Sequence, residues 1–185
     1  RIIVPYPPGG GTDVIARILN EPLAAAIKQP IVIDNRGGAA GSLGTDVVAK
    51  SAPDGYTLLL VSIAYAFAPA MYKTVPFDPA QAFETIGMIG SGPAVLVVHP
   101  GTPIQSVKDL IAYAKANPGA LRIASAGVGS FQHLAGELFR MQAGIQWTHV
   151  PYKGGGPAMA DVVGGHAEAL MGATVQTLPQ VRGGK

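Results

Sequence analysis

The feature that most constrains the fold is a repeated order of short apolar segments, glycine-rich turns and helix-like segments. Glycine-rich stretches at 9–11, 125–130 and 153–156 each follow a predicted strand and precede a predicted helix. Strands and helices that alternate with short connections favour parallel sheets covered by helices. The segment Ser91-Gly92-Pro93 interrupts this alternation. We therefore predict an α/β protein of two domains, residues 1–93 and 94–185.

Apolar periodicity and turn residues predict the individual elements. Thr12 or Asp13 is expected to cap the first helix and Ser42 the next one, while Ser106 and Asp109 form a capping-box-like pair. The strand at 56–61 is expected to be buried. Strands are predicted at 2–4, 31–34, 56–61, 83–89, 94–98, 121–124, 146–150 and 167–171. Helices are predicted at 12–28, 42–50, 107–116, 131–143 and 174–181. A loosely helical stretch is expected from Ser62 to about Met71, and a further helix is expected to start with Pro157 in its first turn.

Composition excludes several classes of function. The 185 residues are 48% apolar and 13% charged, and the net charge of +2 comes from interspersed residues. No basic run suits a nucleic acid or a membrane surface, so neither partner is expected. The chain has no cysteine, which excludes thiol catalysis and disulfides and fits an oxidising compartment. No apolar run reaches the roughly 18 residues that a membrane-spanning helix needs, so direct membrane insertion is not expected.

The stretch Tyr6-Pro7-Pro8-Gly9-Gly10-Gly11-Thr12-Asp13 is the first candidate binding site. It joins an apolar strand to a helix, and the free N–H groups of a helix start suit a carboxylate or phosphate. The lysine of a phosphate-binding P-loop and the glycine spacing of a dinucleotide fingerprint are both missing. Ser125 to Ser130 is a second loop of this kind, and Lys153 lies in a third. The alternative for each is an ordinary strand-to-helix turn.

No catalytic or metal centre is predicted, and no cofactor. The four histidines are spread along the chain, and paired acids or a Gly-x-Ser-x-Gly elbow are not visible. His133 is expected on the first turn of its helix, where it is placed either to reach a ligand or to contact Glu137 four residues on. No nucleophile with a base beside it is expected. The rival interpretation is a hydrolase that uses Ser130 or Ser125 with His133.

Several motifs in order resemble one known family. They include the opening Ile2 to Asp13, the segment Asp34 to Gly41, and Ala52-Pro53-Asp54-Gly55-Tyr56-Thr57-Leu58-Leu59. Further matches are Ala116 to Gly119, Ser125 to Gly127, His133 to Phe139 and His149 to Gly155. Together these motifs cover nearly the whole chain. The sequence resembles the tripartite tricarboxylate transporter receptors of the TctC or Bug type, which are periplasmic solute-binding proteins.

The resemblance implies a two-domain periplasmic-binding-protein-like fold with a ligand between the domains. It also implies a non-enzymatic, monomeric, periplasmic receptor that delivers a small organic carboxylate to the membrane components of a tripartite tricarboxylate transporter. A role as the binding partner of a signalling sensor stays open. The loops would hold one carboxylate, and other residues would line the cleft. The implied ligand-binding set is Tyr6, Gly10, Gly11, Thr12, Asp13, Ser62, Ser125, Ala126, Gly127, Ser130, His133, Lys153, Gly154 and Gly155.

The chain departs from the family pattern in two ways. Family members continue past residue 185 and complete the first domain, so a C-terminally truncated fold is expected, and Arg1 enters directly into a strand. Relatives also often carry Asp-Asn where this chain has Gly172-Ala173. A side-chain contact to the far end of the ligand is therefore expected to be missing.

Overall fold

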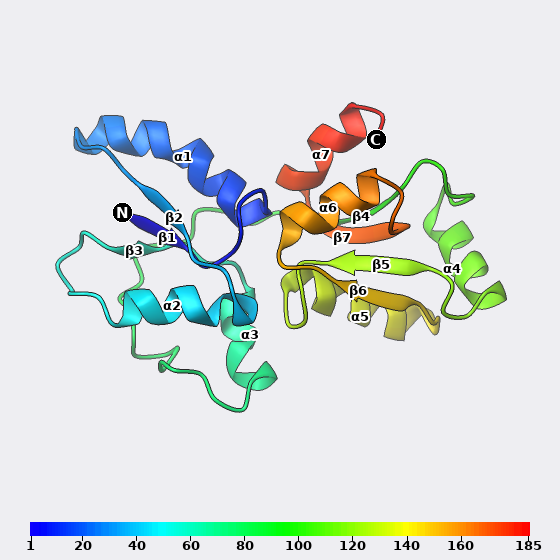
Figure 1. The fold of residues 1–185 in the computed structure, drawn as a ribbon, viewed down its shortest axis with the longest axis horizontal. Coiled ribbons are helices and arrows are strands. Elements are labelled where there is room, and N and C mark those ends of the chain that lie inside the picture. Colours follow the sequence, from blue (N-terminus) through cyan, green and yellow to red (C-terminus); the bar gives the residue numbers. More distant parts are fainter. The chain divides into compact units, whose positions relative to one another are not determined.

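The computed structural model describes residues 1–185, which form two compact units, Arg1–Ser91 and Gly92–Lys185. Each unit contains a parallel-rich sheet with helices packed against it (Figure 1). Each unit is described separately below.

The first unit has a three-stranded parallel sheet in the order β2-β1-β3. Its strands are β1 (Ile2–Val4), β2 (Ile33–Asn35) and β3 (Leu58–Leu59). Its helices are α1 (Gly11–Ile27), the short 3₁₀ helix η1 (Ala39–Gly41), α2 (Ser42–Ala49) and α3 (Ala64–Met71). The connection from β1 to β2 runs in the opposite direction to that from β2 to β3. Right-handed crossovers therefore place α1 and α2 on opposite faces of the sheet (Figure 1).

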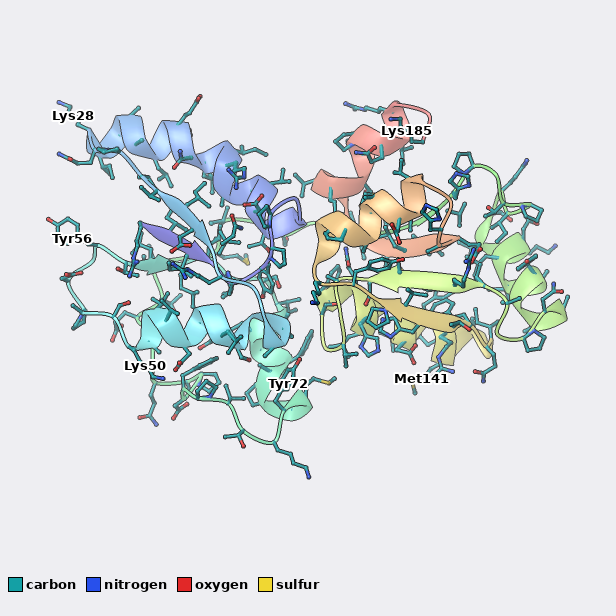
Figure 2. All side chains as sticks on the ribbon, viewed as in Figure 1. Lys28, Lys50, Tyr56, Tyr72, Met141 and Lys185 are labelled. Carbon is teal, nitrogen blue, oxygen red and sulfur yellow. The ribbon has the colours of Figure 1, made fainter.

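β1 is the centre of this unit because both of its neighbours pair with it. Ile2, Val4 and Ala16 form the buried cluster, with Tyr6, Ile33 and Leu60 among the side chains packed around it. Lys28 and Lys50 follow the C-terminal ends of α1 and α2, away from the glycine loops (Figure 2). Positive charge at a helix C-terminus is favourable.

Three expectations for the first unit are wrong. The predicted strand at 83–89 is irregular, and its apolar side chains Ile86 and Met88 are 82% and 84% exposed. The predicted strand at 56–61 shrinks to Leu58–Leu59 and is not buried, because it is an edge strand. The helix caps are Gly10 and Gly41, neither of which offers a side-chain oxygen; the residues expected to cap lie inside the helices.

The second unit has a four-stranded sheet in the order β4-β7-β5-β6. Its strands are β4 (Ala94–Val98), β5 (Arg122–Ser125), β6 (Thr148–Pro151) and β7 (Ala169–Ala173). β4 pairs antiparallel with β7, and the other pairs are parallel. The helices are α4 (Val107–Ala116), α5 (Phe131–Ala143), α6 (Gly155–Val163) and α7 (Thr174–Arg182).

Two cores lie on the two faces of this sheet. Ile123 and Ala169 belong to one cluster, and Ala124 and Leu170 to the other, because neighbouring strand residues point to opposite faces. The first core also holds Trp147, which stacks on Phe139. The helices α5, α6 and α7 all begin at the carboxyl ends of the parallel strands (Figure 1). This edge is where α/β sheets bind ligands.

No helix is at once long enough and apolar enough to cross a bilayer.

Candidate functional site

Asp13 holds the opening loop of the first unit in place. Its side chain is only 2% exposed although it is charged. One carboxylate oxygen accepts from the Gly9 N–H at 2.9 Å and the Arg17 Nε at 3.0 Å. The other accepts from Asn35 Nδ2 at 3.0 Å, and the same amide also donates to the Tyr6 carbonyl. The carboxylate thus joins the loop, α1 and the end of β2.

These bonds decide the ionisation of Asp13. Burial raises the pKa of its carboxyl, but hydrogen bonds from Arg17, Gly9 and Asn35 and the Arg17 charge outweigh it, so the pKa is lowered overall. Asp13 is therefore an anion at neutral pH, and its oxygens are already used by the protein. In this geometry it shapes the loop, while its predicted contact with a ligand stays a prediction.

The start of α1 leaves backbone donors free for an anion. Gly10 provides no side-chain cap, and the first intrahelical bond is from Val14 N to the Gly10 carbonyl. The N–H groups of the residues before Val14, which include Gly11 and Thr12, therefore have no partner within the helix. This arrangement suits a carboxylate at the positive end of the helix dipole.

Tyr6 and Ser62 lie on the same edge of the first sheet. The Ser62 hydroxyl donates to the Tyr6 phenol oxygen at 2.9 Å and accepts from Ala64 N at 3.3 Å. Burial raises the pKa of the Tyr6 phenol, only partly offset by its bonds with Ser62. A Cβ on Gly41 would lie 3.0 Å from the Tyr6 ring, so the glycine allows η1 to approach.

The loop beside Tyr6 is strained. Ala39 and Ala40 have positive φ angles of 46° and 51°, which non-glycine residues rarely adopt. Such strain costs about 1–3 kcal/mol per residue and concentrates at functional sites. None of the predicted ligand-binding residues lies in the segment 36–41, although its high glycine content is evident from the sequence.

In the second unit, the Ser125–Ser130 loop is built around the Ser125 side chain. Ser125 is fully buried, and its hydroxyl lies 2.6 Å from His149 Nε2. It also accepts from Gly127 N at 3.1 Å. Gly127 has a φ of 115°, and a Cβ there would lie 3.0 Å from the Tyr152 carbonyl oxygen, so only glycine fits. The Ser125 hydroxyl is therefore used to hold the loop.

Ser130 caps α5 by accepting from His133 N at 3.2 Å. His133 turns back to the loop, where its Nδ1 accepts from Gly129 N at 3.3 Å, and its ring lies 4.3 Å from that of His149. No hydrogen bond joins His133 to Glu137, although the two interact electrostatically. Glu137 instead binds Arg140 and Trp147, because those donors are within reach of its carboxylate.

Three helix starts meet at the carboxyl edge of the second sheet. Gln132 on α5 donates to Gln176 on α7 at 3.3 Å, and Gln176 donates to the Gly155 carbonyl on α6 at 2.5 Å. A Cβ on Gly155 would lie 3.2 Å from the Gln176 amide. Neither α6 nor α7 has a side-chain cap. The unit thus presents uncapped backbone N–H groups from neighbouring helices, together with the polar loop that precedes α5.

Of the predicted residues, Lys153 and Gly154 lie in the loop before α6, and Gly155 is the first residue of that helix. Lys153 is exposed, whereas Gly155 is buried. Tyr152, next to them, donates its hydroxyl to Asp161 at 2.6 Å, and this bond together with burial raises the Tyr152 pKa to about 12. Gly154 has a φ of 120°, which favours glycine. Ala126, in the neighbouring loop, is partly exposed.

Gly172 has no room for a side chain. A Cβ there would lie 2.4 Å from the Thr177 methyl group and 3.0 Å from a Leu170 methyl group. Thr177 is 1% exposed on α7. The space beside residue 172 is therefore filled by α7, which explains why this position holds a glycine and not a larger residue.

One expectation about catalysis is wrong: a hydroxyl does lie beside an imidazole, since Ser125 meets His149. The two residues are 24 apart in sequence and were not paired by sequence reasoning. Ser125 is fully buried, however, so its hydroxyl is not presented to a substrate, and the Ser130 hydroxyl oxygen is used as a helix cap. No group of three or more His, Asp or Glu side chains is arranged to hold a metal ion.

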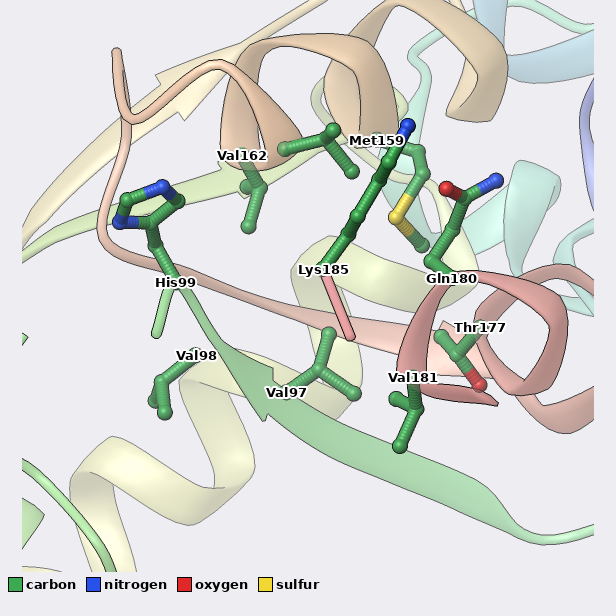
Figure 3. Close-up of a pocket in the computed structure, with 10 residues that line it drawn as sticks. Val97, Val98, His99, Met159, Val162, Thr177, Gln180, Val181 and Lys185 are labelled. Atoms are coloured by element: carbon green, nitrogen blue, oxygen red, sulfur yellow. The ribbon is translucent and has the colours of Figure 1, made fainter. Parts of the chain in front are cut away.

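Two cavities of the second unit lie away from these loops. One of about 10 Å³ lies between β4, α6 and α7, with Lys185 across it (Figure 3). It has the size of about one water molecule. The other, of about 240 Å³, is lined by His99, Thr102 and Glu168 among others, at the opposite end of the sheet from Ser125. Neither contains a predicted site residue.

Replacing Ser130 with alanine tests whether the cap also serves the loop. We expect a loss of about 1 kcal/mol in the free energy of unfolding, measured by urea denaturation, because one helix cap is removed. Ser106→Ala is the matched control, since Ser106 caps α4 in the same way by accepting from Asp109 N at 3.1 Å. An equal loss in both variants, with weaker ligand binding only in Ser130→Ala, is the expected pattern. Equal binding by both variants would remove Ser130 from the site.

Comparison with known proteins decides the family. A model of the tripartite tricarboxylate transporter family receptor matches residues 15–185. The chain belongs to this family. The resemblance inferred from the sequence motifs is thereby confirmed.

Relatives of this receptor family agree in sequence and in fold. BugT of Bordetella pertussis is 42% identical over 183 residues, which are 98% of this chain and 55% of BugT. The structure of Rpa4515 of R. palustris with adipate is 34% identical with a TM-score of 0.95, and it covers 99% of this chain and 62% of its own. MatC of Rhodopseudomonas palustris with bound malate is 29% identical with a TM-score of 0.90, covering 99% and 63%.

Two further matching structures are described as a periplasmic transporter and the periplasmic binding protein BugD. The predicted α/β fold of the periplasmic-binding-protein type is confirmed by these likenesses. The chain spans about half the length of the curated relatives that it matches.

Proposed function

We propose that the protein is a solute-binding receptor for a small dicarboxylate. The observation that carries this proposal is the presence, in each unit, of a glycine-rich loop at the carboxyl edge of a sheet, followed by a helix start with free N–H groups. In the first unit this donor set is Gly10, Gly11 and Thr12. In the second, the predicted residues Ser125, Gly127 and Ser130 shape the loop, because the Gly127 and Ser130 N–H groups donate to the Ser125 hydroxyl and the Gly127 carbonyl. The donors left there are the N–H groups of Phe131 and Gln132 on the first turn of α5, which have no partner within the helix. Each loop would offer its donors to a carboxylate group.

The chemistry of these loops favours binding over catalysis. Backbone N–H groups and helix dipoles stabilise an anion without supplying a nucleophile or a base. The serine hydroxyls in the second loop are used internally, as the geometry at His149 and His133 requires. Adipate and malate, bound by two relatives, are both dicarboxylates. Tyr6, Ser62 and the Lys153-Gly154-Gly155 loop would lie around the rest of the ligand.

Membership of the family supports a cellular location and a partner for this protein. We propose a periplasmic protein that passes its ligand to the membrane components of a tripartite tricarboxylate transporter. A change of conformation on ligand binding would be the signal that these components recognise. The alternative is that the protein is the binding partner of a signalling sensor. A transport assay with the membrane components distinguishes a transport role from a signalling role.

Isothermal titration calorimetry on the protein tests the proposal. We expect at least one of adipate, malate, succinate, citrate and aspartate to bind with a dissociation constant in the micromolar range or lower. A micromolar dissociation constant corresponds to a standard free energy of binding of about −8 kcal/mol. The dimethyl ester of the ligand that binds is the matched control. Because the ester lacks the charges that helix N-termini stabilise, it should bind at least about tenfold more weakly. Failure of every carboxylate, with binding of a neutral sugar, would overturn the proposal.

A further inference from the structure

Tyr152 connects the two loops of the second unit that contain predicted ligand-binding residues. It directly follows β6, and the loop that contains Lys153 leads from it into α6 (Figure 1). Its backbone N–H donates to the Ser125 carbonyl at 2.9 Å. Its carbonyl oxygen lies 3.0 Å from the position that a Cβ on Gly127 would take. Both backbone groups of Tyr152 therefore contact the Ser125–Ser130 loop, while the same residue begins the loop before α6.

The phenol of Tyr152 is held by α6. Its hydroxyl donates to Oδ2 of Asp161 at 2.6 Å, and its ring packs against the buried cluster that includes Met159 and Val162. The bond to Asp161 and burial raise the pKa of Tyr152 to about 12, although the Arg122 charge opposes the effect. The phenol therefore keeps its proton at neutral pH and remains a donor. The side chain is thus fixed on α6 while the backbone contacts the Ser125–Ser130 loop.

The position of Asp161 is unfavourable for the helix itself. Asp161 lies in the last turn of α6, which ends at Val163. A negative charge near the C-terminus of a helix is destabilised by the helix dipole. The hydrogen bond that the Asp161 side chain makes there is the one with Tyr152. The residue type at position 161 therefore suits the contact with the loop better than it suits the helix.

We propose that Tyr152 and Asp161 are positioning residues, whose hydrogen bond keeps the Ser125–Ser130 loop and the loop before α6 in the arrangement that binds a carboxylate. The inference rests on the proposed function, because it assigns a role within the same site. Neither residue has to touch the ligand. Without the bond, Tyr152 can move away from α6, and Gly127 loses the carbonyl group that it packs against. A smaller fraction of molecules then has loops ready to bind, which lowers the apparent affinity.

Calorimetry with adipate and malate at neutral pH is the first test. Tyr152→Phe removes the hydroxyl and keeps the ring, and it should bind about fivefold to tenfold more weakly. Asp161→Ala removes the acceptor and should have the same effect. Asp161→Asn keeps an oxygen that can accept the hydrogen bond, so its affinity should stay within about threefold of the unmodified protein. An Asp161→Asn protein that binds as weakly as Asp161→Ala would contradict the proposal.

A double-mutant cycle shows whether the two residues act through one bond. The combined variant Tyr152→Phe, Asp161→Ala should bind no more than about twofold more weakly than either single variant, because the bond is already absent in each. Losses that multiply, to about 25-fold or more, would mean that the two residues act independently, and they would overturn the proposal.

Thr148→Val is the matched control. Thr148 lies on the same strand, and its hydroxyl donates to the Gly119 carbonyl at 2.7 Å, at the other end of β6 from Tyr152. Tyr152→Phe and Thr148→Val each remove one hydroxyl, and each should lower the midpoint of thermal unfolding by no more than about 4 °C. Weaker binding is expected only in Tyr152→Phe. Equal binding by the two variants would show that the Tyr152 bond has a structural role alone.

Hydrogen exchange of the ligand-free protein separates this inference from the proposed function. Tyr152→Phe should speed the exchange of the Gly127, Ser130 and Tyr152 amides at least about tenfold, because their hydrogen bonds belong to the loop and to its contact with Tyr152. Thr148→Val should leave these rates unchanged. If no carboxylate binds the unmodified protein, the proposed function fails, and the exchange rates still decide whether Tyr152 positions the loop. Unchanged exchange in Tyr152→Phe would rule out the positioning role.

Discussion

Replacing Gly44 with alanine is expected to lower the free energy of unfolding by about 3 kcal/mol. Gly44 lies in the first turn of α2, where a Cβ would be 2.4 Å from the Arg36 carbonyl oxygen and 2.8 Å from the Pro5 Cα. These are backbone atoms at the ends of β2 and β1, so neither can rotate away. The helix would have to move off the central strand, and the packing under the opening loop would be lost.

Urea denaturation measures this effect. Gly87→Ala is the matched control, since no atom lies within 4 Å of a Cβ at that position. It should change stability by less than about 0.5 kcal/mol. In an unobstructed helix, glycine to alanine would stabilise by up to about 1 kcal/mol. A Gly44→Ala protein that is as stable as the unmodified one would therefore show that α2 does not approach β1 this closely.

Replacing Asp13 with alanine is expected to cost about 3 kcal/mol of stability and at least about tenfold in carboxylate affinity. The change leaves the Gly9 N–H and the Asn35 amide without the acceptor that they share. Arg17 loses its ionic partner too, but it keeps a hydrogen bond to Asn35, and its side chain is 56% exposed and can be hydrated. Most of the loss therefore comes from the loop, which no longer has a fixed position before α1.

Asp46→Ala is the matched control for this change. Asp46 pairs with Lys50 at the same four-residue helical spacing, but the Lys50 side chain is 71% exposed. An exposed pair contributes less than about 1 kcal/mol, so the control should lose little stability and no affinity. Equal losses in the two variants would mean that Asp13 is an ordinary helix-surface charge.

Asp13→Ala should also change how the free energy of unfolding depends on pH in the acidic range. The pKa of Asp13 is lowered in the folded protein, so its carboxylate stabilises the fold above the ordinary aspartate value of about 4. That contribution is lost as the pH falls through the folded-state value. Asp13→Ala should therefore lose less stability than the unmodified protein between pH 5 and pH 2, as followed by circular dichroism.

Elements with local signals at both ends were predicted correctly from the sequence. The helix at 107–116 begins after Ser106, whose hydroxyl caps it with Asp109 as expected, and ends before Asn117-Pro118-Gly119. The helix at 131–143 begins after the Ser130 cap and ends at Gly144 in the left-handed conformation. Caps and stop signals act within one helical turn, so the sequence alone contains them.

The predicted strand at 83–89 failed for the opposite reason. Its apolar residues suit a strand, but a strand exists only when another strand offers hydrogen bonds. None does so here, and Ile86 and Met88 stay exposed. The edge strand at Leu58–Leu59 is likewise short because its length is set by pairing with β1.

The sequence by itself determined the alternation of strands, glycine loops and helices, and with it the prediction that the loops at Gly9 to Asp13 and Ser125 to Ser130 bind an anion. Only the tertiary structure decided how these loops are held. His149 meets Ser125 because β5 and β6 pair in parallel, with Ile123 opposite His149. Asp13 meets Asn35 because α1 packs over β1 and β2. Such contacts join residues about twenty positions apart, and strand register, which local sequence signals do not specify, brings them together.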